Sequence, residues 1–174
     1  KRNKTTTKKN EHTRSMHNKG SGEVWMIANS DIFFNNTLWI LKNADIENHF
    51  LALTRYEYRD DNNHKLFANH PNSDNSTVDS QDCWIYQSPV RMVCDASGVS
   101  LCNIPLGYGG CDNKISYIME QLGWKVINPC HTIQSVHVQK NTYGKWLSSM
   151  RPIINNPYRY VIQQRMTLES FQEI

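Results

Sequence analysis

The chain has 174 residues, of which 39% are hydrophobic and 20% are charged, and this composition excludes the disordered and fibrous classes of protein. The formal net charge of +3 comes from residues 1–20, where seven Lys and Arg accompany one acid, and the rest of the chain is slightly acidic. A nucleic-acid site needs cations ordered over a folded face. The basic run therefore predicts a solvated terminal segment and no nucleic-acid partner.

The sequence contains no targeting or membrane signal that we can identify. No apolar run approaches the roughly 18 residues that span a bilayer, and no short apolar segment follows the basic start. Five cysteines without CxxC spacing predict neither a disulfide framework nor a zinc site. We therefore expect free thiols in a reducing compartment such as the cytoplasm, and no transmembrane segment.

The first half of the chain predicts two strands, a short helix and a long loop. The stretch EVWMIANSDIFF indicates a buried strand that ends at the polar triplet of residues 29–31. NNTLWILKNADI is compatible with a short capped helix, and FLALTRYEY alternates as a second strand does. Residues 59–80 are polar and have no sustained period, which is typical of a surface loop.

The second half predicts three more strands and one helix. QDCWIYQSPV indicates a strand closed by Pro89, and residues 91–110 indicate turns and short extended pieces. Residues 112–123 have helical spacing, with Asp112 or Asn113 as the N-cap and Gly123 beyond the end. WKVINP and TIQSVHV predict two strands ahead of a mixed tail. Strands that alternate with helices predict an α/β fold with a mixed sheet flanked by helices.

We find no internal repeat and no hinge composition that would divide the folded part in two. The expected organisation is a basic polar segment over residues 1–22, an α/β domain over residues 23–150, and a tail or helix over residues 151–174 that packs on the domain.

Three polar features lie at the ends of predicted elements, and each has two interpretations. In the triplet Asn29-Ser30-Asp31, the carboxylate can hold a divalent cation that binds phosphates, or the triplet closes the strand as an Asx-turn. Asp112 follows Gly109 and Gly110, so it can face a closely approaching ligand as a general base, or it caps the helix. His137, late in an apolar strand, is either a metal ligand or a hydrogen-bonded core residue.

In this order the segments resemble glycosyltransferases with the GT-A fold. GYGGCDNKI, followed by GWKVINP and HVQKN, is similar to the galactosyltransferase-type Gly-rich loop with an acid, a helix, and a strand that leads to a histidine. NSDI, ALTR, QDCWI and GCDN are similar to motifs of a group of GT-A-like proteins. The resemblance runs from about Glu23 to about Tyr143. It implies transfer of a sugar from a nucleotide-sugar donor to a hydroxyl of a glycan or another acceptor.

The resemblance also implies roles for single residues. Asp31, at the D-x-D position, and His137 would hold Mn²⁺ or Mg²⁺ and through it the diphosphate, and Asp112 would deprotonate the acceptor hydroxyl. Donor and acceptor contacts would come from Asn29, Ser30, Gly109, Gly110 and Asn113. Arg55 is added as a phosphate-binding fork, against an ordinary surface ion pair, and Asp82 as a residue facing the donor sugar, against a turn or cap role.

The chain departs from the family pattern in three places. Only Asp31 keeps a carboxylate in the D-x-D triplet, Cys111 replaces the leading glutamate of the Gly-rich loop, and only 28 residues precede Asn29. We therefore expect the nucleotide-binding half to be missing, reduced, or supplied by the N-terminal part of a longer chain. The alternative is a non-catalytic carbohydrate-binding or structural module, in which Trp84, Tyr108 and Trp124 either stack on sugars or pack in the core.

Overall fold

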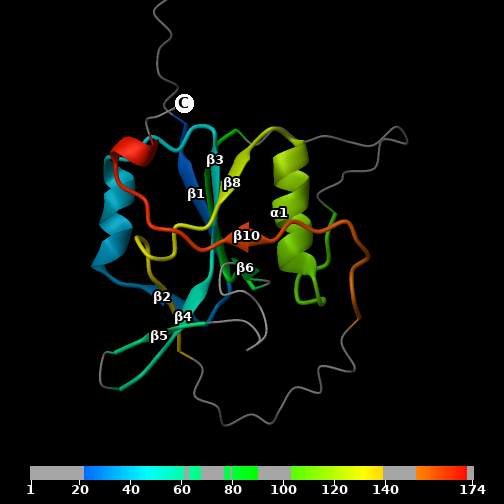
Figure 1. The fold of residues 1–174 in the computed structure, drawn as a ribbon, viewed down its shortest axis with the longest axis horizontal. Coiled ribbons are helices and arrows are strands. Elements are labelled where there is room, and N and C mark those ends of the chain that lie inside the picture. The colour runs from blue at the N-terminus through cyan, green and yellow to red at the C-terminus, as the bar shows by residue number, and fades with distance from the viewer. Residues whose placement is uncertain are drawn as a thin grey trace, which may run out of the picture.

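The structure is a computed structural model, and it describes residues 22–60, 63–67, 77–78, 80–89, 103–138 and 152–171. Residues 1–21 of the predicted basic segment, the turns predicted at residues 91–102, and part of the predicted loop lie outside the described residues. The strands form two four-stranded mixed sheets and one two-stranded sheet (Figure 1). The predicted α/β class with a mixed sheet is therefore confirmed, with two mixed sheets and few helices.

Sheet A has the strand order β1-β7-β3-β8, and only its β3 and β8 run parallel. Its strands are β1 (Val24–Ala28), β7 (Cys83–Gln87), β3 (His49–Leu53) and β8 (Lys125–Ile127). Sheet B has the order β2-β9-β4-β5, with β9 and β4 parallel. Its strands are β2 (Ile32–Phe34), β9 (Ser135–His137), β4 (Arg55–Glu57) and β5 (Lys65–Leu66). In the third sheet β10 (Val161–Ile162) pairs with β6 (Thr77–Val78).

Three helices accompany the sheets among the described residues. They are the 3-10 helix η1 (Asn36–Lys42), the α-helix α1 (Cys111–Gln121) and the 3-10 helix η3 (Glu169–Phe171). Asn35 caps η1, as the sequence predicted for this short helix. The helix predicted here is present as α1, but its predicted N-cap was wrong, because Gly110 in a left-handed conformation is the N-cap and Asp112 lies inside the first turn. No helix in the described part of the chain is both long enough and apolar enough to cross a membrane.

Sheet A carries one hydrophobic cluster on each face, and η1 and α1 lie on opposite sides of it (Figure 1). The cluster on the η1 side is centred on Leu51, Leu53, Ile85 and Ile133, and apolar residues of η1 pack against it. The cluster on the α1 side contains Phe50, Trp84, Met119, Trp124 and Val126. Trp84 and Trp124 are thus core residues, so the core interpretation of these two aromatics is the correct one.

Strand β1 is an edge strand, and the prediction that it would be buried was wrong. All five of its residues are exposed, and Val24, Trp25, Met26 and Ile27 have exposed fractions of 38 to 51%. It pairs only with β7 in the described residues, antiparallel, so its other edge carries no strand there. Its continuous apolar run is what a strand covered on both faces would have, which explains the wrong prediction.

The predicted strand FLALTRYEY is two strands in two different sheets. β3 ends at Leu53 and β4 begins at Arg55, and Thr54 between them is held by Asn128. The predicted surface loop over residues 59–80 contains the two short strands β5 and β6. The change of sheet at Thr54 places β4 beside β9, where His137 lies.

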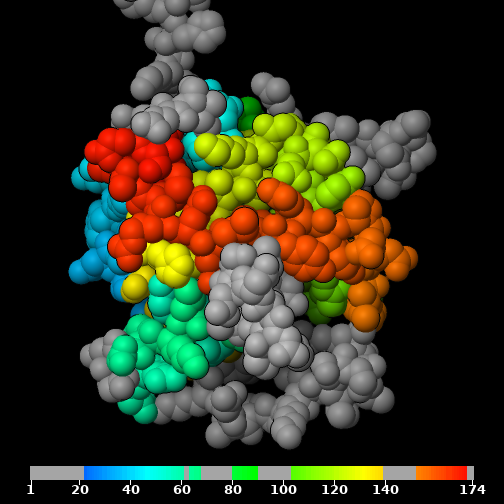
Figure 2. Space-filling model, in the orientation of Figure 1, coloured from blue at the N-terminus to red at the C-terminus, as the bar shows by residue number. Residues whose placement is uncertain are grey.

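The C-terminal segment crosses the face of the molecule in front of α1 and sheet A (Figures 1 and 2). It is anchored by bridges between Ile153 and Gly109 and between Gln163 and Asn128. This segment therefore contacts the Gly-rich loop before α1 and the residue after β8.

Candidate functional site

The register of sheet B brings three titratable side chains together. β9 lies between β2 and β4, and His137 is paired with Ile32 on one side and with Glu57 on the other. Nε2 of His137 lies 2.9 Å from Oδ2 of Asp31, the residue before β2. Nδ1 of His137 lies 3.2 Å from Oε2 of Glu57. The imidazole is therefore held between two carboxylates, and His137 is not a simple core residue.

The register of sheet A brings a second set of polar groups to the same place. Asp82 precedes β7, and its carbonyl accepts a bond from the backbone N–H of Asn29. The side-chain amide of Asn29 donates to Oδ1 of Asp82 at 2.8 Å. A guanidinium nitrogen of Arg55 donates to Oδ2 of the same carboxylate at 2.8 Å. The side-chain amide of Asn29 thus ties the end of β1 to the start of β7.

Arg55 joins the two sets into a closed ring of contacts. Its Nε donates to Oε1 of Glu57 at 2.8 Å, so one guanidinium bridges Glu57 and Asp82. The ring runs through the side chains of Asn29, Asp82, Arg55, Glu57, His137 and Asp31, and the backbone of residues 29–31 closes it. It contains three carboxylates and one guanidinium, so it carries excess negative charge when His137 is neutral.

Burial within the ring is uneven. The side chains of Arg55, Asp82 and His137 are largely buried, whereas those of Asp31 and Glu57 are 40% and 38% exposed. Burial by itself would raise the pKa of Glu57, but the hydrogen bonds from Arg55 and His137 outweigh it and lower that pKa. The carboxylates of Asp31 and Glu57 are therefore the parts of the ring that a ligand in solvent reaches most easily.

Asp112 lies next to this ring at the start of α1. Its Oδ2 accepts a bond from the backbone N–H of Gln81 at 3.4 Å, and its Oδ1 accepts one from the thiol of Cys111 at 3.1 Å. Burial raises the pKa of Asp112 to about 6, and the nearby charge of Asp82 adds to the increase. A carboxylate with a pKa near neutrality is suited to accept a proton at physiological pH.

The glycines before α1 are bound by the C-terminal segment. The N–H of Gly109 donates to the carbonyl of Pro152 at 2.9 Å, and its carbonyl accepts from Ile154 at 2.9 Å. Gly110 has φ +81°, and a Cβ on it would come within 2.6 Å of the Tyr158 hydroxyl. Close packing against the C-terminal segment thus explains why glycine stands at these positions. Their role in ligand binding stays a prediction.

The structure brings most of the predicted site residues together. Asn29, Asp31, Arg55, Asp82 and His137 belong to the ring, and Asp112 adjoins it. Ser30 is exposed in the turn, and Asn113 is buried in the first turn of α1, where its carbonyl accepts from Arg159. Arg55 forms a partly buried double ion pair, so the alternative of an ordinary surface ion pair was wrong.

Sequence reasoning missed Glu57. The alternation in FLALTRYEY places Arg55 and Glu57 on the same face of a strand, so a carboxylate two residues after a singled-out arginine was the available signal. The partnership with His137 depends on a parallel pairing across 80 residues, which no local pattern contains.

The contact between Asp31 and His137 satisfies one geometric requirement of a metal site. Neighbouring ligands of an octahedral Mg²⁺ lie about 3 Å apart, and the two side-chain atoms here lie 2.9 Å apart. No set of three or more His, Cys, Asp or Glu side chains in the described ranges is arranged to hold a metal. The pair would therefore need further oxygens from a ligand or water, as is common where Mg²⁺ binds together with substrate phosphates.

Comparison with known proteins adds no relative: no protein-family model, no characterised protein and no solved structure matches the chain.

Proposed function

We propose that the protein is a glycosyltransferase that moves a sugar from a nucleotide-sugar to a hydroxyl of a glycan or another acceptor. The observation that supports this best is the closed ring of contacts, with the partly exposed Asp31 in it and the half-buried Asp112 adjoining it. One group is suited to bind a cation and the other to accept a proton. A displacement with a diphosphate leaving group needs both.

Asp31 and His137 would hold Mn²⁺ or Mg²⁺, which supplies positive charge for the diphosphate. With a metal ion on Nε2, the hydrogen of neutral His137 would lie on Nδ1, where Glu57 is placed to accept it. The excess negative charge of the ring favours a cation beside Asp31. Arg55 fixes the two carboxylates of the ring in place. Its Nη1 also donates to Oγ of Ser80 at 3.4 Å, so Nη2 is the nitrogen that would meet a phosphate oxygen.

In the transfer step the carboxylate of Asp112 takes the proton of the acceptor hydroxyl. The acceptor oxygen forms a bond to the anomeric carbon while the bond from that carbon to the phosphate oxygen breaks, and the nucleoside diphosphate leaves. A positioned base contributes about 10²–10⁴-fold to such a step. The pKa of about 6 leaves Asp112 mainly ionised at neutral pH and still basic enough to accept the proton.

The test is calorimetric titration of the protein with UDP-sugars and GDP-sugars, with Mn²⁺ and with EDTA, together with an assay of nucleoside diphosphate release. We expect Mn²⁺-dependent binding that Asp31→Asn abolishes and that Asp60→Asn, at an exposed turn, leaves unchanged. Asp112→Asn should retain the binding and lose at least a hundredfold in release. Absence of any Mn²⁺-dependent binding by the unaltered protein would contradict the proposal.

A second candidate is a non-catalytic carbohydrate-binding module, and one observation favours it. The backbone of Gly109 is already paired with Pro152 and Ile154, so the Gly-rich loop has no free donor at that residue for a ligand. Sugar binding that needs neither metal nor nucleotide, with no diphosphate release, would support this candidate over the enzyme.

A further inference from the structure

The exposed face of η1 repeats every third residue. Asn36, Trp39 and Lys42 are exposed, while the residues between them are half-buried against sheet A. A 3-10 helix has three residues per turn and rises about 2 Å per residue, so these three side chains form one row with a spacing of about 6 Å. An amide, an indole and an ammonium group therefore follow one another along one face.

Trp39 is the most exposed of the tryptophans that the structure describes. Its exposed fraction is 70%, against 51% for Trp25 and at most 9% for Trp84 and Trp124. Tryptophan is enriched at binding interfaces, because its ring offers a large apolar face and its indole N–H a hydrogen-bond donor.

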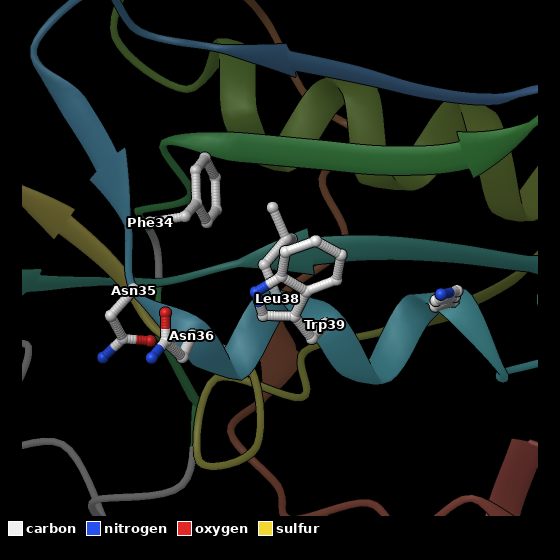
Figure 3. A pocket seen from close by; sticks show the side chains of 6 residues that line it. Phe34, Asn35, Asn36, Leu38 and Trp39 are labelled. Carbon is white, nitrogen blue, oxygen red and sulfur yellow. The ribbon is translucent and has the colours of Figure 1, made fainter.

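An open pocket of about 340 Å³ lies beside the indole, and a pocket of this size suits a small ligand. Figure 3 shows its apolar side chains together with the amide groups at the start of η1. The lining residues are Phe34, Asn35, Asn36, Leu38, Trp39 and Lys42. Three of these side chains are apolar, two carry amides and one carries an ammonium group.

Hydrogen bonds to a neighbouring segment fix the start of η1. The side chain of Asn35 accepts bonds from the N–H and the hydroxyl of Thr37 and donates its own amide to Gln134 at 2.6 Å. The N–H of Gln134 in turn donates to the Thr37 hydroxyl at 2.9 Å. Because these bonds tie η1 to the segment before β9, a ligand on the row would not have to order the helix first.

We propose that this pocket binds a pyranose ring of a glycan, stacked on the indole of Trp39. The C–H face of a pyranose is apolar and matches the indole, while its hydroxyls need donors and acceptors at the ring edge. Asn36 offers both, and Lys42 offers donors on the other side of the indole. Neither a metal nor a nucleotide takes part, so the proposal is independent of the transfer reaction.

The experiment is a glycan microarray probed with the purified protein in EDTA, followed by calorimetric titration with the oligosaccharides that bind. We expect Trp39→Ala to weaken binding at least tenfold, and Asn36→Ala and Lys42→Ala to weaken it by smaller factors. Trp25→Ala is the matched control, because Trp25 is also an exposed tryptophan but lies on β1. Its binding should equal that of the unaltered protein.

Three results would overturn the inference. They are the absence of any bound glycan on the array, binding that survives Trp39→Ala, and equal losses in the Trp39 and Trp25 variants. Circular dichroism of each variant shows whether a loss comes from unfolding. If Trp39→Ala itself fails to fold, Trp39→Phe replaces it, and an unchanged affinity in the folded Asn36 and Lys42 variants would then count against the site.

Discussion

The carboxylate of Glu57 lies 3.2 Å from Nδ1 of His137, and the other ring nitrogen of that histidine lies 2.9 Å from Asp31. A metal ion on Nε2 would require the hydrogen of the neutral imidazole on Nδ1, and Glu57 is placed to accept that hydrogen. Glu57 is thus a positioning residue for the face of His137 that meets Asp31.

Glu57→Gln tests this arrangement with almost no change in shape. The new amide would donate to Nδ1, so the hydrogen of a neutral imidazole would move to Nε2 and block coordination there. Loss of such an outer partner typically costs 10–100-fold in metal affinity, and we expect a loss of that size for Mn²⁺, measured by electron paramagnetic resonance. Glu120→Gln is the control, because Glu120, on α1, has a similarly exposed carboxylate and pairs with Arg159 outside the site. Equal Mn²⁺ affinity in both variants would contradict the role of Glu57.

The sequence predicts the strands of this site well and their assembly poorly. Alternation and apolar runs depend on neighbouring residues, and they located the regions of β3, β4, β7, β8 and β9. The change of sheet at Thr54 was missed because it depends on Asn128, whose side chain accepts the Thr54 N–H at 3.1 Å and donates to its hydroxyl at 2.9 Å. A contact across 74 residues leaves no local signal.

The candidate site was predictable to the extent that its residues end or begin strands. Asp31, Asp82 and His137 were singled out for that reason, and the register of two sheets then brings them together. Asp112 was found through the glycines before it, although its predicted cap role was wrong. Gly110 takes the cap position because only a residue tolerant of φ +81° fits against Tyr158 there.

Asp112→Asn should make the protein more stable at neutral pH. Burial raises the pKa of Asp112 to about 6, whereas an unfolded Asp titrates near 3.9. The folded state therefore loses stability as the pH rises from about 4 to about 6. The uncharged amide of the variant escapes this cost, and we expect a gain of roughly 1–2 kcal/mol at pH 7, after allowing for residual solvent and for the lost acid at the helix start.

Urea denaturation at several pH values measures this difference. The gain should be present above pH 6 and should vanish below pH 4, where the aspartate is protonated in both states. Asp60→Asn, at an exposed turn, should show no such dependence. A variant that is less stable than the parent at pH 7 would instead indicate that the carboxylate serves mainly to stabilise α1.

Gly110→Ala and Gly107→Ala separate backbone strain from a steric clash. Both glycines have positive φ, +81° and +85°, so alanine costs about 1–2 kcal/mol of strain at either position. At Gly107 the new Cβ would meet nothing within 4 Å, whereas at Gly110 it would lie 2.6 Å from the Tyr158 hydroxyl. We expect Gly110→Ala to lower the free energy of unfolding by about 1–3 kcal/mol more than Gly107→Ala does.

The clash can be removed to check its origin. In a Tyr158→Ala background the two alanine variants should cost nearly the same, because the ring that occupies the space is gone. A difference that persists in that background would mean that Tyr158 is not the cause. The Tyr158 hydroxyl also donates to the carbonyl of Ile154. The loss of stability caused by Tyr158→Ala alone is therefore measured separately and subtracted in a double-mutant cycle.

Ile27→Thr and Ile85→Thr compare the edge strand β1 with the strand β7 beside it. Ile85 is fully buried in the cluster on the η1 side of sheet A, whereas Ile27 is 47% exposed on β1. The same substitution should cost about 2–3 kcal/mol at Ile85 and less than about 0.5 kcal/mol at Ile27, measured by urea denaturation. Both positions lie in strands, so β-propensity favours neither. Comparable losses at the two positions would mean that both faces of β1 are covered in solution, and the continuous apolar run of β1 would then have the explanation that the sequence first predicted.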